Sequence, residues 1–178
     1  GVETAKINFA MDPLHKFAQQ VSLVSTPYDY AGNPASVAQL LGVSESDPAF
    51  NFASYDIGNF VYFPQVPADK FRLGRAYFMG YSTPLPLSIQ GTPADTTRPY
   101  DILLNAGWNL IGDPFLFTID WNKVKVVQNG AVYSHSDALA NGLIGSSLYS
   151  YTSGFYAQSF SIDPWVGYWV KAYQNVSL

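Results

Sequence analysis

The stretch AGWNLIGDPF, which runs from Ala106 to Phe115, decides how we interpret the fold of this chain. Side chains on a strand alternate between two faces, so Trp108 and Leu110 are expected on one face and Ile111 on the other. Pro114 ends the strand, because proline cannot donate a hydrogen bond to a neighbouring strand. We therefore predict a core strand with a fixed exit turn.

A fainter copy of this strand lies near the N-terminus, and two further pairs of similar stretches follow in the same order. The pairs are Val21–Tyr28 with Trp108–Phe115, Ala53–Phe60 with Tyr149–Tyr156, and Gly74–Met79 with Trp165–Val170. The members of each pair are about ninety residues apart, which favours a duplicated unit over chance. We predict two units, about 17–81 and 104–173, joined by a Pro-rich connector over 82–101 in which 85–91 could form a strand.

Each predicted unit consists of a first strand, a short helix, a hairpin and a closing strand. The helices are expected within 34–42 and 134–145, and the first of these has Pro near its start and Gly at its end. Gly58 and Gly154 each lie between aromatic-rich runs, which is a hairpin signal. The stretch Val166–Tyr173 alternates most strongly and is predicted as a closing strand.

The predicted fold class is all-β, with one or two short helices in the connections. The chain contains 13 Tyr, 12 Phe and 4 Trp, residue types that are enriched in strands. Neither half shows enough strands for a complete sandwich, so we expect the two units to share one core. The expected architecture is a single domain over 1–178, a β-sandwich or barrel in which pseudo-twofold symmetry relates the two units.

The composition excludes several classes of protein. Hydrophobic residues make up 48% of the chain and charged residues only 12%, the opposite of a disordered sequence. The net charge is −4 and the nine basic residues are scattered, so no basic cluster is present to bind nucleic-acid phosphates. No apolar run approaches the length of a membrane span, and the sequence begins without a signal peptide. We expect neither nucleic-acid binding nor membrane insertion, and the absence of cysteine excludes disulfides.

Three stretches resemble a recurrent module of secreted and cell-surface multidomain proteins of bacteria. They are Gly107–Phe115, Asp120–Trp121 and Pro164–Ala172. Such modules carry a Gly-Trp-Asn-Leu-Ile-Gly-Asn-Pro-Phe strand, and Asp113 here stands where they have the second Asn. The resemblance implies a secreted or cell-surface accessory domain with neighbouring domains in the same chain, and it implies no catalytic residue. We accordingly expect the chain to be a piece of a larger protein.

The residue types give little support to catalysis. The chain has no Cys, and neither His15 nor His135 lies near a Gly-x-Ser-x-Gly turn, so we interpret His135 as a surface-loop residue. Glycoside hydrolysis requires two carboxyl groups, but Glu3 and Glu45 are poorly placed and the Asp residues mostly lie in turn contexts. We predict that the protein is not an enzyme.

No cofactor is predicted from the sequence. It lacks a His/Cys cluster for zinc or iron and an Asp-x-Asp-x-Asp loop for calcium. A calcium ion between loops stays open, with Asp47, Asp95 and Asp137 as candidates that no motif singles out.

Aromatic side chains form the expected binding surface, because sugar rings present C–H faces that stack on exposed Trp and Tyr rings. Core positions are expected for at least one face of the strands that hold Trp108, Tyr168 and Trp169. The residues predicted to contact a ligand are Trp121, Trp165, Tyr133, Tyr149 and Tyr62. The sequence thus predicts a non-catalytic extracellular module that binds polysaccharide or oligosaccharide. The alternative is a structural or interaction domain of a multidomain protein with no small ligand.

Overall fold

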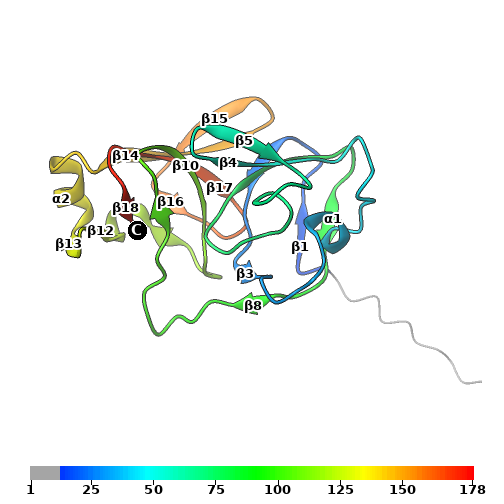
Figure 1. Ribbon diagram of the computed structural model, residues 1–178, viewed down its shortest axis with the longest axis horizontal. Coiled ribbons are helices and arrows are strands. Elements are labelled where there is room, and N and C mark those ends of the chain that lie inside the picture. Colours follow the sequence, from blue (N-terminus) through cyan, green and yellow to red (C-terminus); the bar gives the residue numbers. More distant parts are fainter. Residues whose placement is uncertain (1–12) are drawn as a thin grey trace, which may run out of the picture.

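The computed structural model describes residues 13–178 and shows strands arranged in layers, with two short helices at opposite ends of the molecule (Figure 1). The all-β prediction is confirmed. The part of the domain prediction that covers residues 1–12, Glu3 included, lies outside the described residues.

The largest sheet has eight strands, and all of its pairs are antiparallel. Seven strands follow the order β10 (Gly107–Gly112), β17 (Gly167–Ala172), β14 (Ile144–Thr152), β2 (Ser22–Val24), β6 (Tyr77–Gly80), β4 (Asn51–Asp56) and β5 (Asn59–Tyr62), and β15 (Phe155–Ser159) pairs with β14. The first strand of this order, β10, also lies against β4, so the sheet curls back toward itself.

Shorter strands and the helices cover this sheet. The two-stranded pairs are β1 (His15–Phe17) with β7 (Leu85–Leu87), β3 (Tyr28–Asp29) with β8 (Thr92–Pro93), and β11 (Ile119–Asp120) with β16 (Ser161–Ile162). A four-stranded sheet has the order β13 (Ala131–Tyr133), β12 (Val126–Gln128), β18 (Val176–Ser177) and β9 (Leu103–Leu104). The helices are α1 (Val37–Leu40), α2 (His135–Ala140) and the 3-10 turn η1 (Trp121–Lys123).

Local sequence signals explain the helices and the main hairpins. Ser36 caps α1 by accepting a hydrogen bond from the backbone N–H of Gln39, and Ser134 caps α2 in the same way. The β4–β5 and β14–β15 hairpins turn at residues 57–58 and 153–154, where both positions have positive φ and the second is glycine. The helices and hairpins predicted from the sequence are confirmed at these positions.

The strands of the two predicted units pair in the same order. In the first unit the order is β2-β6-β4-β5, and in the second it is β10-β17-β14-β15. Isolated bridges join Val24 to Val166 and Arg75 to Ile111. The repeat pairs Val24 with Ile111 and Arg75 with Val166, so the two bridges are the same contact made twice. This pairing order agrees with the predicted units, while their duplication stays a prediction.

We call the contact between the two units the seam. It consists of residues 24–25 and 111–112, which lie against residues 165–167 and 74–76. The Ser25 N–H donates to the Trp165 carbonyl (3.0 Å), and the Gly112 N–H donates to the Gly74 carbonyl (3.1 Å). Gly112 has no space for a side chain, because a Cβ there would collide with that of Ser25 and lie 2.9 Å from the Arg75 carbonyl oxygen.

Buried side chains form three clusters instead of the single shared core that we expected. The first core draws on residues 17–87 and the half-buried Trp165, and the second on residues 102–178. A small central cluster contains Leu23, Ala76 and Leu110. The expectation was wrong because the connections of each unit cover the outer face of its own strands. Strand alternation then directs Leu23 and Leu110 toward the central cluster, and the residues that follow them toward the separate cores.

Candidate functional site

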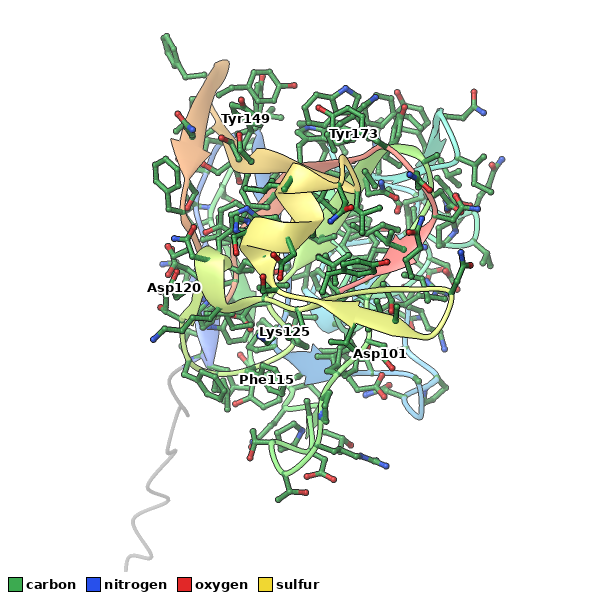
Figure 2. All side chains as sticks on the ribbon, turned by 90° about the vertical axis from the view of Figure 1, so that its left-hand side faces the viewer. Asp101, Phe115, Asp120, Lys125, Tyr149 and Tyr173 are labelled. Carbon is green, nitrogen blue, oxygen red and sulfur yellow. The ribbon has the colours of Figure 1, made fainter. Side chains whose placement is uncertain are left out.

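Six aromatic side chains line an open groove of about 590 Å³ on the sheet face that the central cluster occupies. We call it the aromatic groove; its residues are Tyr55, Phe60, Trp108, Tyr149, Tyr156 and Trp169. They come from β4, β5, β10, β14, β15 and β17, so both units contribute. The β4–β5 and β14–β15 hairpins lie on the same side of the molecule (Figure 1), and Tyr149 is at the upper edge in Figure 2. The lining, within residues 13–178, contains no charged side chain.

The rings of the aromatic groove support one another in edge-to-face contacts. Trp169 meets Tyr55 with ring centroids 4.8 Å apart and meets Trp108 at 6.2 Å, with interplanar angles of 77° and 80°. Trp108 also contacts Tyr149 at 6.2 Å. Such contacts restrict ring rotation. Trp108 still exposes 44% of its surface, so the groove presents a fixed ring to solvent.

Alternation along two paired strands places the tryptophans in the groove. In β17, Tyr168 points into the second core and the next residue, Trp169, points to the opposite face. Cross-strand pairing sets Trp108 opposite Lys171 and Leu110 opposite Trp169. The Lys171 Nζ lies 5.6 Å from the Trp108 ring centroid, a cation–π contact that helps to hold this exposed ring.

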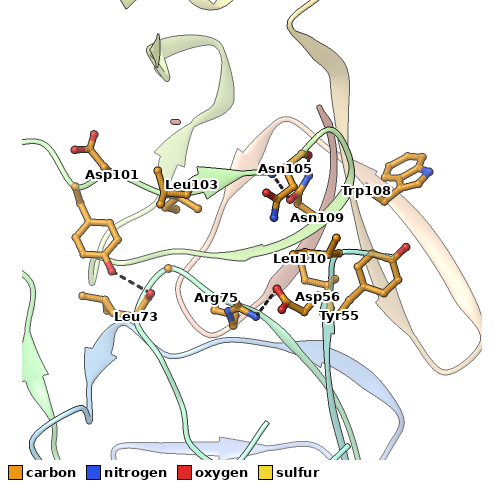
Figure 3. Close-up of a pocket in the computed structure, with 14 residues that line it drawn as sticks. Tyr55, Asp56, Leu73, Arg75, Asp101, Leu103, Asn105, Trp108, Asn109 and Leu110 are labelled. Carbon is orange, nitrogen blue, oxygen red and sulfur yellow. Dashed lines mark hydrogen bonds and ion pairs between the residues drawn. The ribbon is translucent and has the colours of Figure 1, made fainter. Parts of the chain in front are cut away.

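A smaller polar cleft of about 230 Å³ adjoins the aromatic groove (Figure 3). Tyr55 and Trp108 line both cavities. In the cleft, Arg75 Nη1 lies 3.6 Å from an Asp56 carboxylate oxygen and donates to the buried Ser54 hydroxyl at 3.2 Å. The cleft thus provides charged and polar groups directly beside the aromatic rings.

A pair of asparagines fixes the chain beside Trp108. The Asn105 N–H donates to Asn109 Oδ1 (2.9 Å), and Asn109 Nδ2 donates back to the Asn105 carbonyl (2.8 Å). Both residues line the polar cleft, and Figure 3 shows them between Leu103 and Trp108. These bonds close the turn into β10, so the exposed Trp108 extends from a restrained backbone.

Two tryptophans that we predicted as ligand contacts do not line the aromatic groove. Trp121 is fully buried in the second core, and its ring lies 5.2 Å from that of His135. Asp120 caps the η1 turn and thereby sets the inward direction of Trp121. Trp165 is half-buried: its ring stacks on His15 at 4.4 Å and packs against the first core. Full burial removes Trp121 from the candidate ligand contacts, whereas Trp165 stays a prediction, and His135 is buried instead of lying in a surface loop.

The three predicted tyrosines lie at different places. Tyr149 lines the aromatic groove, whereas Tyr133 packs against the second core. Tyr62 is exposed on β5 but does not line the groove. The sequence-based choice missed Trp108 and Trp169, although the alternation in their strands already separated them from Ile111 and Tyr168.

Asp113, at the end of β10, is the most perturbed carboxyl group outside the groove. It is fully buried, and its Oδ1 accepts a hydrogen bond from the Phe115 N–H (2.8 Å). Burial raises the pKa of Asp113 to about 7, and the negative charge of Asp163 contributes to this rise. In the first unit, Thr26 occupies the corresponding position, and its neutral hydroxyl accepts from the Tyr28 N–H (3.2 Å).

The three candidate calcium ligands form hydrogen bonds with different partners and not with a common site. Asp47 accepts hydrogen bonds from the Tyr81 hydroxyl and the Ala49 N–H, and Asp95 accepts from Thr97. Asp137 accepts a hydrogen bond from the hydroxyl of Ser134, the N-cap of α2. Among residues 13–178, no group of three or more His, Asp or Glu side chains is arranged to hold a metal ion.

Comparison with known proteins finds no matching family model, no matching curated protein and no matching solved structure. The resemblance to a bacterial cell-surface module therefore stays a prediction. In the part of the chain that the structure describes, no helix has both the length and the apolar character needed to cross a membrane.

Proposed function

We propose that this chain is a non-catalytic module that binds carbohydrate in the aromatic groove. The observation that carries the proposal is the groove itself: six partly exposed rings from six strands line it, and five of them contact one another edge to face. A sugar ring presents C–H bonds that stack on aromatic faces, and rigid aromatic side chains lose little conformational entropy when they bind. A neutral lining suits an uncharged polysaccharide or oligosaccharide.

An extracellular setting is part of this proposal. Charged residues make up 12% of the chain, and the stretches around Trp108 and Trp169 resemble a secreted or cell-surface bacterial module. On this proposal the partners are a polysaccharide and neighbouring domains of the same chain.

A second candidate is a structural or interaction domain with no small ligand. Phe155, beside the turn of the β14–β15 hairpin, is 78% exposed and does not line the aromatic groove. An exposed aromatic at a hairpin end can dock against another protein surface. This candidate predicts that loss of Phe155 impairs function more than loss of Trp108.

The experiment compares two variants against a panel of neutral polysaccharides by affinity electrophoresis and intrinsic tryptophan fluorescence. Trp108→Ala is expected to weaken binding at least about tenfold, which corresponds to about 1.4 kcal/mol, and to reduce the ligand-induced fluorescence change. Phe155→Ala is the matched control, since it removes an exposed ring outside the groove. Absence of binding across the panel, or equal binding by the two variants, would reject the proposal.

A further inference from the structure

The aromatic groove and the polar cleft are adjacent and share two lining side chains. Tyr55 and Trp108 line both cavities, and Figure 3 shows them at one end of the cleft, with Arg75 and Asp56 between that end and Leu73. A ligand that stacks on Trp108 therefore lies directly beside the cleft, within reach of its polar groups.

The two cavities differ in chemistry. The groove offers aromatic rings, whereas the cleft offers a guanidinium group, a carboxylate and side-chain amides. Arginine has five N–H donors, and the protein contacts of the Arg75 guanidinium in residues 13–178 use Nη1. Arg75 and Asp56 are both partly exposed. Together they present neighbouring donors and acceptors, the combination that adjacent sugar hydroxyls require.

The Arg75 side chain is held in place from both ends. Its backbone forms the seam bridge with Ile111, and its guanidinium donates to the buried Ser54 hydroxyl. A group that is fixed before binding loses less conformational entropy when a ligand arrives. Arg75 is thus placed to select a ligand as well as to attract it.

The shape of the cleft indicates which part of a ligand it accepts. It is less than half as large as the groove, about 230 Å³ against about 590 Å³, and it is more enclosed. Tyr100 lines it, and the Tyr100 hydroxyl donates to the Leu73 carbonyl at 3.0 Å. A small and polar space that is only partly open to solvent suits one terminal sugar better than the middle of a continuing chain.

The corresponding position on the other side of the seam has none of these groups. The repeat pairs Arg75 with Val166 and Asp56 with Thr152, neither of which forms an ion pair. It also pairs Trp108 with Val21. The polar pair and the exposed tryptophan therefore occur together, on one side of the molecule.

We infer that the polar cleft is an end subsite: it binds the terminal sugar of a neutral glycan whose following units stack in the aromatic groove, and Arg75 with Asp56 determines the preference for chain ends. This inference rests on the proposed function.

The test compares chain ends with chain interiors. The probes are neutral hexasaccharides of glucose, xylose and mannose, each paired with its long polymer at equal sugar mass. The native protein is expected to bind several-fold more of the hexasaccharide, because fragmentation multiplies the ends. Arg75→Gln and Asp56→Asn are each expected to weaken hexasaccharide binding at least about tenfold and to remove its advantage over the polymer.

The variants separate this inference from the proposed function. If Trp108→Ala abolishes binding while Arg75→Gln and Asp56→Asn bind as the native protein does, the end subsite is wrong and the groove proposal stands. Equal binding of hexasaccharide and polymer by the native protein also overturns the end subsite. If no probe binds the native protein, both proposals fail. Circular dichroism checks that each variant folds. If Arg75→Gln does not fold, Asp56→Asn alone tests the inference, because Asp56 is partly exposed.

Discussion

The backbone has the same geometry on the two sides of the seam, but the side chains differ. On one side Tyr55, Arg75 and Trp108 meet; on the other, the repeat places Tyr151, Val166 and Val21. The aromatic groove and the polar cleft lie on the first side. Under the predicted duplication and the proposed function, the comparison teaches that a few exposed residues suffice to place a site at one of two equivalent positions.

The shared backbone is visible in paired details. Gly74 and Trp165 have φ of +75° and +72°, and the carbonyl of each accepts a hydrogen bond across the seam. The hydroxyl of the buried Tyr77 accepts from the Arg72 N–H (2.9 Å). The hydroxyl of Tyr168 likewise accepts from the N–H of a residue five positions earlier (3.2 Å). These backbone contacts are made on both sides, although the side chains around them differ.

The largest expected effect on stability comes from a substitution that disrupts the seam. Gly112→Val would place a branched side chain against Ser25 and the Arg75 carbonyl, where even a Cβ has no space. We expect a loss of about 4 kcal/mol or more in the free energy of unfolding, because backbone atoms cannot move aside cheaply. Urea unfolding measures it. Gly32→Ala is the control, since a Cβ there meets nothing within 4 Å, and equal stability of the two variants would contradict the close packing.

A smaller effect concerns the neighbouring position, where the first unit has Thr26 and the second has Asp113. Because the pKa of Asp113 is raised to about 7, the folded state retains its proton at pH values where the unfolded chain has already lost it. The stability contribution of Asp113 is therefore greatest below about pH 4, falls as the pH rises, and is lost above about pH 7. The full cost is roughly 4 kcal/mol, since one pKa unit corresponds to about 1.4 kcal/mol.

Asp113→Asn removes this titration and keeps an oxygen that can accept from the Phe115 N–H. We expect the variant to be more stable than the native protein at pH 8 and about equal at pH 4. Urea unfolding at both pH values measures the difference. A native protein whose stability between pH 4 and pH 8 changes in the same way as that of the variant would show that Asp113 does not carry the effect.

The smallest expected effect on stability comes from a substitution that makes the two sides of the seam more alike. Val21→Trp adds the tryptophan that the first unit lacks, at a side chain that is 48% exposed. Surface changes of this kind usually alter stability by less than about 0.5 kcal/mol. The proposed function predicts one ligand per chain by titration calorimetry for both the variant and the native protein, because Ala53 and Val166 stand where the side with the groove has Tyr149 and Arg75. A second site of equal affinity would mean that the tryptophan alone makes the site.

Much of the fold could be predicted from local patterns. Pro114 follows β10, the turn at residues 57–58 ends in glycine, and Ser36 and Ser134 cap the two helices. Each of these signals acts within a few residues, so no knowledge of distant contacts is needed. The candidate site could not be predicted in the same way: of the residues chosen from the sequence, the aromatic groove contains Tyr149 alone.

The sequence by itself determined the strands, the turns and the two faces of each strand, because proline, glycine, capping residues and alternation act locally. Only the tertiary structure decided which face is covered. Trp121 begins the 3-10 turn η1 and is nevertheless fully buried in the second core, whereas Trp108 lies in β10 of the largest sheet and is exposed. Burial depends on what distant segments bring against a side chain. Contacts between distant segments also bring Arg75 and Trp108, from different units, into the lining of one cleft. Neither stretch of sequence predicts that cleft by itself.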